Sequence, residues 1–245
     1  MGGSTPHAPW DPPAEGGLAR LAFMTEQGTP GVGSLVIGIL GGTGEQGRGL
    51  ARRFALAGNQ VIIGSRSHDR AQGVAREIGG STRGLANRDC AREADVVIAA
   101  VPWEGHGELL SGLAAELAGK IVVDCVNPLG FDHRGAYPLP VAEGSAAQQA
   151  EALLPESRVV AAFHHVSAVL LLDPAIETID SDVLVLGDDR QATDTVQALA
   201  ARIPGVRGVY AGRLRNCGQI EALTANLVSI NRRYKAHAGL RITDI

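Results

Sequence analysis

A glycine-rich stretch directly after a short apolar run is the part of this sequence best suited to bind an anion. Residues 35–40 are apolar and rich in β-branched side chains, which predicts a buried parallel strand. Gly42, Gly44 and Gly47 follow with G-x-G-x-x-G spacing, and a helical pattern begins at the last of them. Such a loop lets the backbone approach a pyrophosphate, which free N–H groups at the helix N-terminus then bind. A chance match is the alternative in a chain with 32 glycines, but the position between a strand and a helix favours a dinucleotide site.

The end of the second predicted strand, residues 60–63, indicates which dinucleotide is bound. Sites for NAD usually carry Asp or Glu here, to accept hydrogen bonds from the ribose 2′-hydroxyl. This chain instead has Ser65, Arg66 and Arg70. Guanidinium groups pair with a 2′-phosphate, which a carboxylate would repel, and a serine hydroxyl can donate to it. We therefore predict a preference for NADP(H); the alternative is an exposed turn with incidental arginines.

Strands alternate with helices along the chain, as expected of a fold that places such loops at one sheet edge. Apolar runs predict strands over 35–40, 60–63, 95–101, 120–126, 159–163, 182–186 and 206–210. Helical patterns cover 47–58, 69–78, 87–93, 108–117, 191–202 and 216–237. Together they predict an α/β fold, a Rossmann-type doubly wound parallel sheet with a smaller C-terminal α/β module.

Composition divides the chain into three segments. Residues 1–34 are rich in Gly, Pro and Ala, and we expect a flexible leader. Residues 35–155 are predicted to form an NADP-binding Rossmann domain, and residues 156–245 a smaller C-terminal domain that completes the site. The polar, Pro-containing stretch 138–157 is the expected boundary.

The overall composition argues against several classes of protein. With 45% hydrophobic and 20% charged residues the chain is globular rather than disordered. Its net charge of −4 speaks against binding nucleic acid or an anionic membrane, and no apolar run reaches the roughly 18 residues of a membrane span. The three cysteines are scattered, which argues against a zinc site and favours a reducing cytoplasm. His164 and His165 are adjacent, but no cluster of further ligands supports a metal site.

From residue 35 onward the chain resembles the NADPH:coenzyme F420 oxidoreductases, which are deazaflavin-dependent NADP reductases. The stretch from Leu40 to Arg53 matches their L-G-G-T-G-x-x-G-x-G-L-A-x-R loop and helix. Shorter matches after later strands are G-S-R at 64–66 and V-P-W at 101–103. Residues 159–164 match V-V-x-A-x-H, and a G-x-L-x-N-x-x-x-x-E-x-L-T pattern runs over 212–224. The later segments are the more specific ones.

The resemblance implies reversible hydride transfer between NADP(H) and an 8-hydroxy-5-deazaflavin, coenzyme F420, as co-substrate. Both reacting rings belong to small-molecule redox carriers, so the protein need only hold them at reacting distance and no residue is expected to be catalytic. The residues expected to bind the carriers are Gly42, Thr43, Gly44, Gln46, Gly47, Ser65, Arg66 and Arg70 for NADP, Val101, Pro102 and Trp103 beside the nicotinamide, Asn127 at the pocket, and His164, Val166 and Asn216 around the deazaflavin.

Two other functions stay open from the residues alone. One is an NADP-dependent reductase of a small carbonyl or imine, which usually needs a positioned general acid, often a lysine. Lys120 and Lys235, the two lysines of the chain, are poorly placed for that task. The other is a non-catalytic NADPH-sensing protein built on the same fold.

Two features near the C-terminus have alternative interpretations. A concentration of arginines suits either solvated helix faces or the anionic phosphate and glutamate tail of the deazaflavin. These arginines are Arg207, Arg213, Arg215, Arg232 and Arg233. The last predicted helix has an apolar face that either closes the core or joins two subunits, and we expect a homodimer. That face carries Ile220, Leu223, Leu227 and Ile230.

Overall fold

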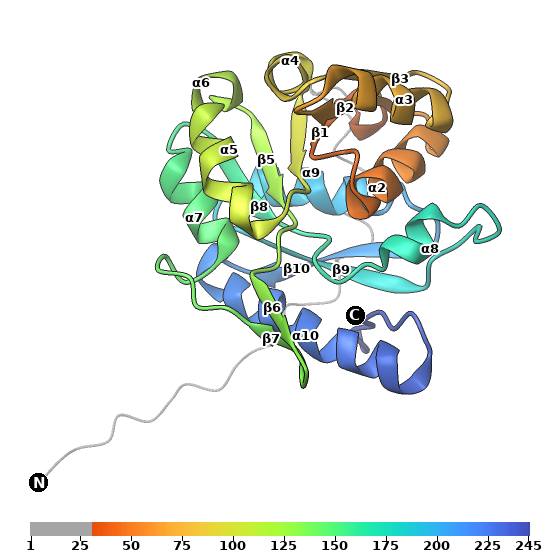
Figure 1. The fold of residues 1–245 in the computed structure, drawn as a ribbon, viewed down its shortest axis with the longest axis vertical. Helices are drawn as coiled ribbons and strands as arrows, with labels where there is room; N and C mark the ends of the chain where they lie inside the picture. The colour runs from red at the N-terminus through yellow and green to blue at the C-terminus, as the bar shows by residue number, and fades with distance from the viewer. Residues whose placement is uncertain (1–30) are drawn as a thin grey trace, which may run out of the picture. The chain divides into compact units, whose positions relative to one another are not determined.

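The computed structural model describes residues 31–245 (Figure 1). Most of the predicted leader, residues 1–30, lies outside this part of the chain. Its end at Val32–Ser34 forms a short 3-10 helix, η1, and the Val32 carbonyl accepts a hydrogen bond of 2.8 Å from the Asn59 side chain. From Val32 to Ile245 the chain forms one compact unit.

Eight strands form one sheet in the order β10-β9-β8-β5-β4-β1-β2-β3. Neighbouring strands from β3 to β8 are parallel, and the order β3-β2-β1-β4-β5-β8 is that of a Rossmann-type sheet, which confirms the predicted fold class. β9 is antiparallel to β8, and β10 is parallel to β9. The strands are β1 (Val36–Leu40), β2 (Gln60–Ser65), β3 (Thr82–Ala86), β4 (Val96–Ala99), β5 (Ile121–Asp124), β8 (Arg158–Ala161), β9 (Ser181–Gly187) and β10 (Val206–Gly212).

Helices cover both faces of the sheet, because the strand residues point alternately to two hydrophobic clusters. One cluster packs under α2, α3, α8 and α9, and the other under α4 to α7 and the start of α10. The helices are α2 (Glu45–Leu56), α3 (His68–Ile78), α4 (Asn87–Glu93), α5 (His106–Gly112), α6 (Ala114–Leu117), α7 (Ala146–Leu153), α8 (Ala168–Leu172), α9 (Arg190–Ala200) and α10 (Cys217–Tyr234), with 3-10 turns η2 (Trp103–Gly105) and η3 (Leu214–Asn216).

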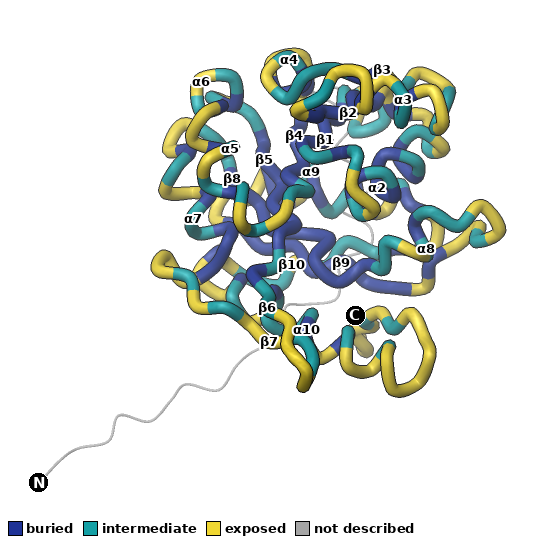
Figure 2. The backbone as a smooth tube through the Cα atoms, viewed as in Figure 1, coloured by how far each residue is buried: buried dark blue, intermediate teal, exposed yellow. Residues whose placement is uncertain are grey.

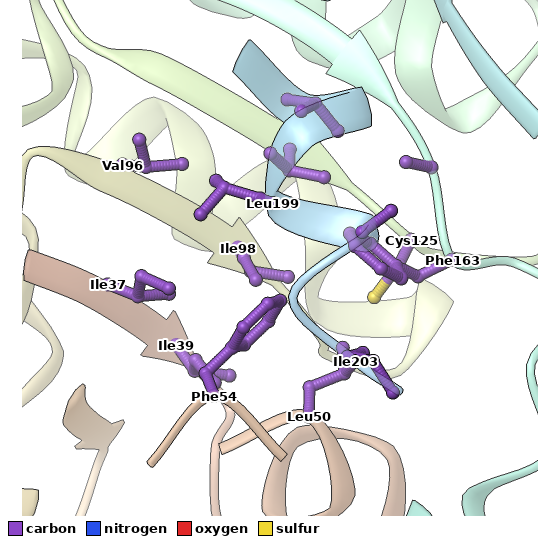
Figure 3. Close-up of a cluster of buried hydrophobic side chains, with 14 of the residues drawn as sticks. Ile37, Ile39, Leu50, Phe54, Val96, Ile98, Cys125, Phe163, Leu199 and Ile203 are labelled. Atoms are coloured by element: carbon purple, nitrogen blue, oxygen red, sulfur yellow. The ribbon is translucent and has the colours of Figure 1, made fainter. Parts of the chain in front are cut away.

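Phe54 of α2 lies at the centre of the first cluster. Figure 3 shows its ring beside Ile39 and Ile98 of the central strands. The ring also meets Phe163 edge-on, with centroids 6.0 Å apart and an interplanar angle of 88°. Phe163 follows β8 with a φ of 65°, a conformation that non-glycine residues rarely adopt, and its buried ring holds it there. The backbone that leads from β8 toward the predicted deazaflavin residues is therefore fixed by core packing.

A two-stranded antiparallel hairpin, β6 (Leu129–Asp132) and β7 (Gly135–Pro138), stands apart from the main sheet. Figure 2 shows the tip of the hairpin as exposed, whereas the central strands are buried. The hairpin and α7 occupy the region where composition predicted a domain boundary. The expected division after residue 155 falls between α7 and β8, and β8 pairs with β5 in the main sheet. Two separate domains therefore stay a prediction.

All three cysteines, Cys90, Cys125 and Cys217, are free and buried. Among residues 31–245 no helix is long and apolar enough to cross a membrane. The same residues contain no group of three or more His, Cys, Asp or Glu side chains that could hold a metal ion.

Candidate functional site

The glycine loop joins β1 to α2 at the carboxyl edge of the sheet. The Gly42 N–H donates to the Gly64 carbonyl at 3.0 Å, which ties the loop to β2. A Cβ on Gly47 would lie 2.7 Å from the Cα of Gly42, so the packing of helix on loop itself requires glycine. A Cβ on Gly44 would meet no atom closer than 3.5 Å. The fold therefore does not require glycine at this second motif position, but a pyrophosphate lying against the backbone would.

The N-terminus of α2 is open to an anion. Gly44 is its N-cap, and no side chain of the described residues caps the helix. The first-turn N–H groups can thus bind phosphate oxygens, with Thr43 half-buried beside them. Gln46 donates to the Phe163 carbonyl at 3.2 Å, which connects this helix start to the segment after β8.

The end of β2 presents two arginines and two serines. Ser65 is buried, and its Oγ accepts from the Ser67 N–H at 3.2 Å. Ser67 caps α3 by accepting from the Arg70 N–H at 3.4 Å. Arg66 and Arg70 are exposed, and neither forms an ion pair with another described residue. Two uncommitted guanidinium groups beside a helix N-terminus suit a phosphate group.

Val101, Pro102 and Trp103 follow β4, next to the glycine loop. Trp103 is half-buried and begins η2. Its indole lies against the imidazole of the fully buried His106, with ring centroids 5.6 Å apart and planes tilted by 31°. One of the predicted nicotinamide residues, Trp103, therefore packs on a buried polar side chain.

That polar side chain, His106, belongs to a buried hydrogen-bond network that the sequence pattern did not predict. Asp124, the last residue of β5, is fully buried, and its Oδ2 lies 2.5 Å from His106 Nε2. Oε1 of Gln149 lies 3.0 Å from His106 Nδ1. Burial lowers the pKa of His106, but the hydrogen bond and charge of Asp124 outweigh it, so the pKa is raised overall. The available signal was a carboxylate inside an otherwise apolar strand run.

The segment after β8 is held against the end of β5. Asn127 Nδ2 donates to the His164 carbonyl at 2.8 Å, and Thr224 Oγ1 of α10 lies 3.3 Å from that carbonyl and from Asn127 Oδ1. The buried imidazole of His164 has no hydrogen-bond partner at either nitrogen within the described chain. Burial lowers its pKa to about 4, against the opposing charge of Asp124, so the ring is neutral. A buried neutral imidazole with both nitrogens unsatisfied can bind a polar group of a ligand.

The other predicted deazaflavin residues are not equally placed. His165 donates from Nε2 to the backbone carbonyl of Asp182 at 2.7 Å, which gives it a structural task. Val166 is buried in the core cluster. Asn216 is exposed at the N-cap of α10, about 12 Å along the helix axis from Thr224. No hydrogen bond in the described part of the chain joins Asn216 to the segment after β8.

The C-terminal arginines do not form one patch. Arg207 and Arg213 pair with aspartates at the start of β9 and just after its end. Arg232 and Arg233 instead line a cavity of about 480 Å³ together with Arg134 of the hairpin. No ion pair within residues 31–245 involves these last three side chains.

The glycine loop, the arginines after β2, Trp103, Asn127 and the segment after β8 all lie at one edge of the sheet. They do so because parallel strands end at the same edge. The strand order reverses between β1 and β4, where open α/β sheets bind their ligands.

The family model described as NADP oxidoreductase, coenzyme F420-dependent, matches residues 36–128. The F420-dependent NADP reductase of Methanothermobacter thermautotrophicus is 39% identical over 221 residues, covering 85% of this chain and 95% of that protein. The F420-dependent NADP reductase of Methanocaldococcus jannaschii is also 39% identical, covering 85% of this chain and 98% of that protein.

A solved structure from Arthrobacter sp. FB24, described as a candidate F420-dependent NADP reductase, has a similar fold. It superposes with a TM-score of 0.76 at 27% identity, covering 86% of this chain and 100% of that chain. The likeness therefore extends well beyond the dinucleotide-binding half.

Proposed function

The chain belongs to the family of F420-dependent NADP reductases, and from that premise we propose how its sheet edge performs their reaction. The protein is an oxidoreductase that transfers a hydride between NADP(H) and coenzyme F420. One observation supports the placement of the site: the glycine loop, the free arginines, Trp103 and the His164 segment share the carboxyl edge of the sheet.

The NADP end of the site uses the loop and the end of β2. The open N-terminus of α2 binds the pyrophosphate, and the space at Gly44 lets it approach the backbone. Arg66 and Arg70 pair with the 2′-phosphate, with Ser65 as a neighbouring hydroxyl. This arrangement accounts for a preference for NADP(H) over NAD(H).

At the ring end of the site, the protein's residues position the two carriers and do not react with them. When bound, the two carriers supply both the hydride donor and the hydride acceptor. Val101, Pro102 and Trp103 border the nicotinamide, while His164 flanks the deazaflavin. The core packing of Phe163 and the hydrogen bond from Asn127 to the His164 carbonyl keep the deazaflavin side of the site in place. No residue of the chain needs to act as an acid or base in the hydride step.

Mixing the protein with NADPH and oxidised F420 tests this function directly. We expect the visible absorbance of the oxidised deazaflavin to bleach as NADPH is consumed. Tight NADPH binding with no bleaching would support the sensor instead. Consumption of NADPH with a small carbonyl or imine, in the absence of F420, would support the alternative reductase. Against that alternative, the Lys120 ammonium donates to the backbone carbonyls of Arg92 and Ala94, where it serves the fold.

We further propose that the cavity between the hairpin and α10 receives the anionic tail of F420. Val228 and Arg232, which line it, lie about one and two helical turns beyond Thr224 on α10. The cavity therefore begins close to the proposed ring site. Binding of tailed F420 should weaken with rising salt more than binding of the tail-less deazaflavin; insensitivity to salt would remove this proposal.

The expected homodimer and the cytoplasmic location also stay proposals. Leu227 of the predicted apolar face is buried in the chain's own fold, whereas Ile230 is 39% exposed. Tyr234 on α10 and Phe131 on the hairpin are 73% and 69% exposed, which supplies apolar surface for a second copy. Analytical ultracentrifugation would establish the assembly, and a monomer at micromolar concentration would count against it.

A further inference from the structure

His106 is a fully buried titratable group that the hydride reaction does not use. It begins α5, directly after η2, and its ring is enclosed by three other elements. Asp124 of β5 faces its Nε2, Gln149 of α7 faces its Nδ1, and Glu221 of α10 acts on it through charge. A histidine kept in such a setting needs an explanation, because burying a polar ring costs free energy unless its hydrogen bonds are made.

The hydrogen bonds determine the protonation state of His106. Gln149 Nε2 donates to Oε2 of Glu143 at 3.3 Å, which leaves its Oε1 toward the imidazole. An amide oxygen only accepts, so His106 Nδ1 must carry a proton. Nε2 faces a carboxylate oxygen of Asp124 at 2.5 Å and carries one as well. The ring is therefore an imidazolium, paired with a carboxylate whose other oxygen accepts from the Val126 N–H at 2.9 Å.

The other charged group near this pair does not replace it. Glu221 is buried, and its two oxygens accept from the N–H groups of Ala146 and Ala147 at 2.9 and 3.2 Å. Burial raises the pKa of Glu221 to about 7, partly offset by those two bonds. The direct partner of His106 thus remains Asp124, and Glu221 adds a more distant negative charge that favours the imidazolium.

The imidazolium lies against the indole of Trp103. Centroids 5.6 Å apart and planes tilted by 31° allow a cation–π contact, which is stronger away from water. Trp103 follows β4 by a short turn and comes three residues before His106. The tightly bound imidazolium therefore fixes the position of the Trp103 indole through contact with one face of that ring.

We propose that His106 is a positioning residue, which as an imidazolium bound to Asp124 and Gln149 holds Trp103 in place to receive the nicotinamide of NADPH. This rests on the proposed function, which places the nicotinamide at Trp103. Loss of the proton removes the donor to Gln149 and leaves Asp124 as a buried charge without its counterion. The indole is then released, and NADPH binds more weakly. Because the folded pKa is raised, the change occurs as pH rises above the ordinary value for histidine.

Tryptophan emission tests the contact without any ligand. The chain has two tryptophans, so a Trp10→Phe variant leaves Trp103 as the sole emitter. An imidazolium in contact quenches indole emission more than a neutral imidazole does. We expect emission to rise with pH in one transition above about pH 6.5. Asp124→Asn should move that transition to lower pH, and His106→Gln should abolish it. A transition unchanged in both variants would overturn the proposal.

Calorimetric titration with NADPH tests the consequence independently of F420 turnover. The dissociation constant should rise about five- to tenfold in His106→Gln, and its dependence on pH should disappear. His237→Gln, at an exposed position after α10, is the matched control and should behave as the parent protein. An NADPH affinity in His106→Gln equal to that of the parent protein would overturn the proposal, even if F420 is reduced normally. Failure of F420 reduction with these binding results intact would count against the proposed function alone.

Discussion

The glycines of the loop after β1 have different surroundings, although the motif treats them alike. Gly47 is packed directly against the backbone of Gly42, so the helix can approach the loop only without a side chain there. Gly44 has an extended backbone, with φ −79° and ψ 166°, and a Cβ there would come no closer than 3.5 Å to another atom, the Gly41 carbonyl oxygen. Any residue can adopt that conformation. Glycine is therefore required at position 47 for folding, and we expect it to be required at position 44 for ligand binding.

Gly44→Ala should leave the free energy of unfolding within about 1 kcal/mol of the parent, since the new methyl group comes no closer than 3.5 Å to the protein, an ordinary van der Waals contact. NADPH binding should weaken by about tenfold or more, because the methyl group displaces the pyrophosphate from the N–H groups. Gly47→Ala should instead cost about 1–3 kcal/mol of stability through overpacking. Urea unfolding and calorimetric titration measure the two effects. An NADPH affinity unaffected by Gly44→Ala would contradict the placement of the pyrophosphate.

Arg66 should determine the choice between the two nicotinamide dinucleotides. Arg66→Asp replaces a free guanidinium by a carboxylate that repels the 2′-phosphate, so the KM for NADPH should rise about tenfold or more. The KM for NADH should change little. Arg190→Asp, the same charge reversal at an exposed position on α9, is the control and should leave the ratio of the two KM values unchanged. Equal effects of both variants would indicate long-range charge rather than a specific contact.

The residues of the site were predictable where local pattern carries the information. The glycine loop, Arg66 and Trp103 each follow an apolar strand and Ser65 ends one, so the sequence predicted that they share one edge of the sheet, as they do in the structure. Their binding roles stay predictions. The pairing of His106 with Asp124 was not predictable, because it depends on how α5 folds back over β5. No sequence periodicity reports such a contact.

At the scale of elements, apolar periodicity predicted most strands of the central sheet and most helices that cover it. β3, at the sheet edge, was not predicted, because an edge strand needs no continuous apolar run. Its sequence contains Gly84, where a Cβ would lie 2.3 Å from the backbone of α3, so close packing accounts for the glycine. The hairpin β6–β7 and the short helices α7 and α8 were also missed, since their residues are polar, Ala-rich or too few to show a period.

α8 illustrates how one side chain can hold an irregular element in place. Arg53 of α2 is buried and donates to the carbonyls of Leu170, Leu171 and Ile176 at 2.5, 2.9 and 2.7 Å. These carbonyls lie in α8 and in the loop after it, downstream of the segment with His164. A single guanidinium thus satisfies three backbone acceptors that the short helix cannot pair itself.

Arg53→Met should lower the free energy of unfolding by about 2–4 kcal/mol, because it keeps an unbranched apolar stem but leaves backbone carbonyls unpaired. Arg83→Met removes a partly exposed ion pair with Glu93 and should cost no more than about 1 kcal/mol. Urea titration followed by circular dichroism measures both. Similar losses in the two variants would show that the carbonyls find other partners.

At the scale of the whole molecule, Asp182 ties the last residues of the chain to the sheet. Its carboxylate accepts two hydrogen bonds of 2.7 Å from Arg207, one of 2.6 Å from Arg241 and one of 2.7 Å from the Ile242 N–H. These bonds, Arg207 foremost, hold the pKa of Asp182 well below its ordinary value despite burial. The segment after α10 is thereby fastened beside β9 and β10.

Because the pKa of Asp182 is lower in the folded than in the unfolded state, its ionised carboxylate stabilises the fold at neutral pH. This stabilisation is lost as pH falls below the ordinary aspartate range. Asp182→Asn should therefore cost about 2 kcal/mol at pH 7, and the difference from the parent should shrink as pH falls from about 4 toward 2. Asp194→Asn, at an exposed position, should show almost no difference at any pH. Thermal unfolding at several pH values measures this. A difference in stability between the parent and Asp182→Asn that stays constant with pH would contradict the stabilising role of the ionised Asp182 carboxylate.

The burial of all three native thiols has a practical consequence. Burial raises the pKa of the Cys90 thiol to about 12 and those of Cys125 and Cys217 further still, so thiolate is scarce at neutral pH. The three thiols of the folded protein should therefore resist mild oxidants and should not react with maleimide reagents. A single cysteine introduced on the surface, for example at an exposed hairpin position, would then be labelled alone. The wild-type chain is thus already a clean background for attaching fluorophores or spin labels to follow the binding of its two carriers.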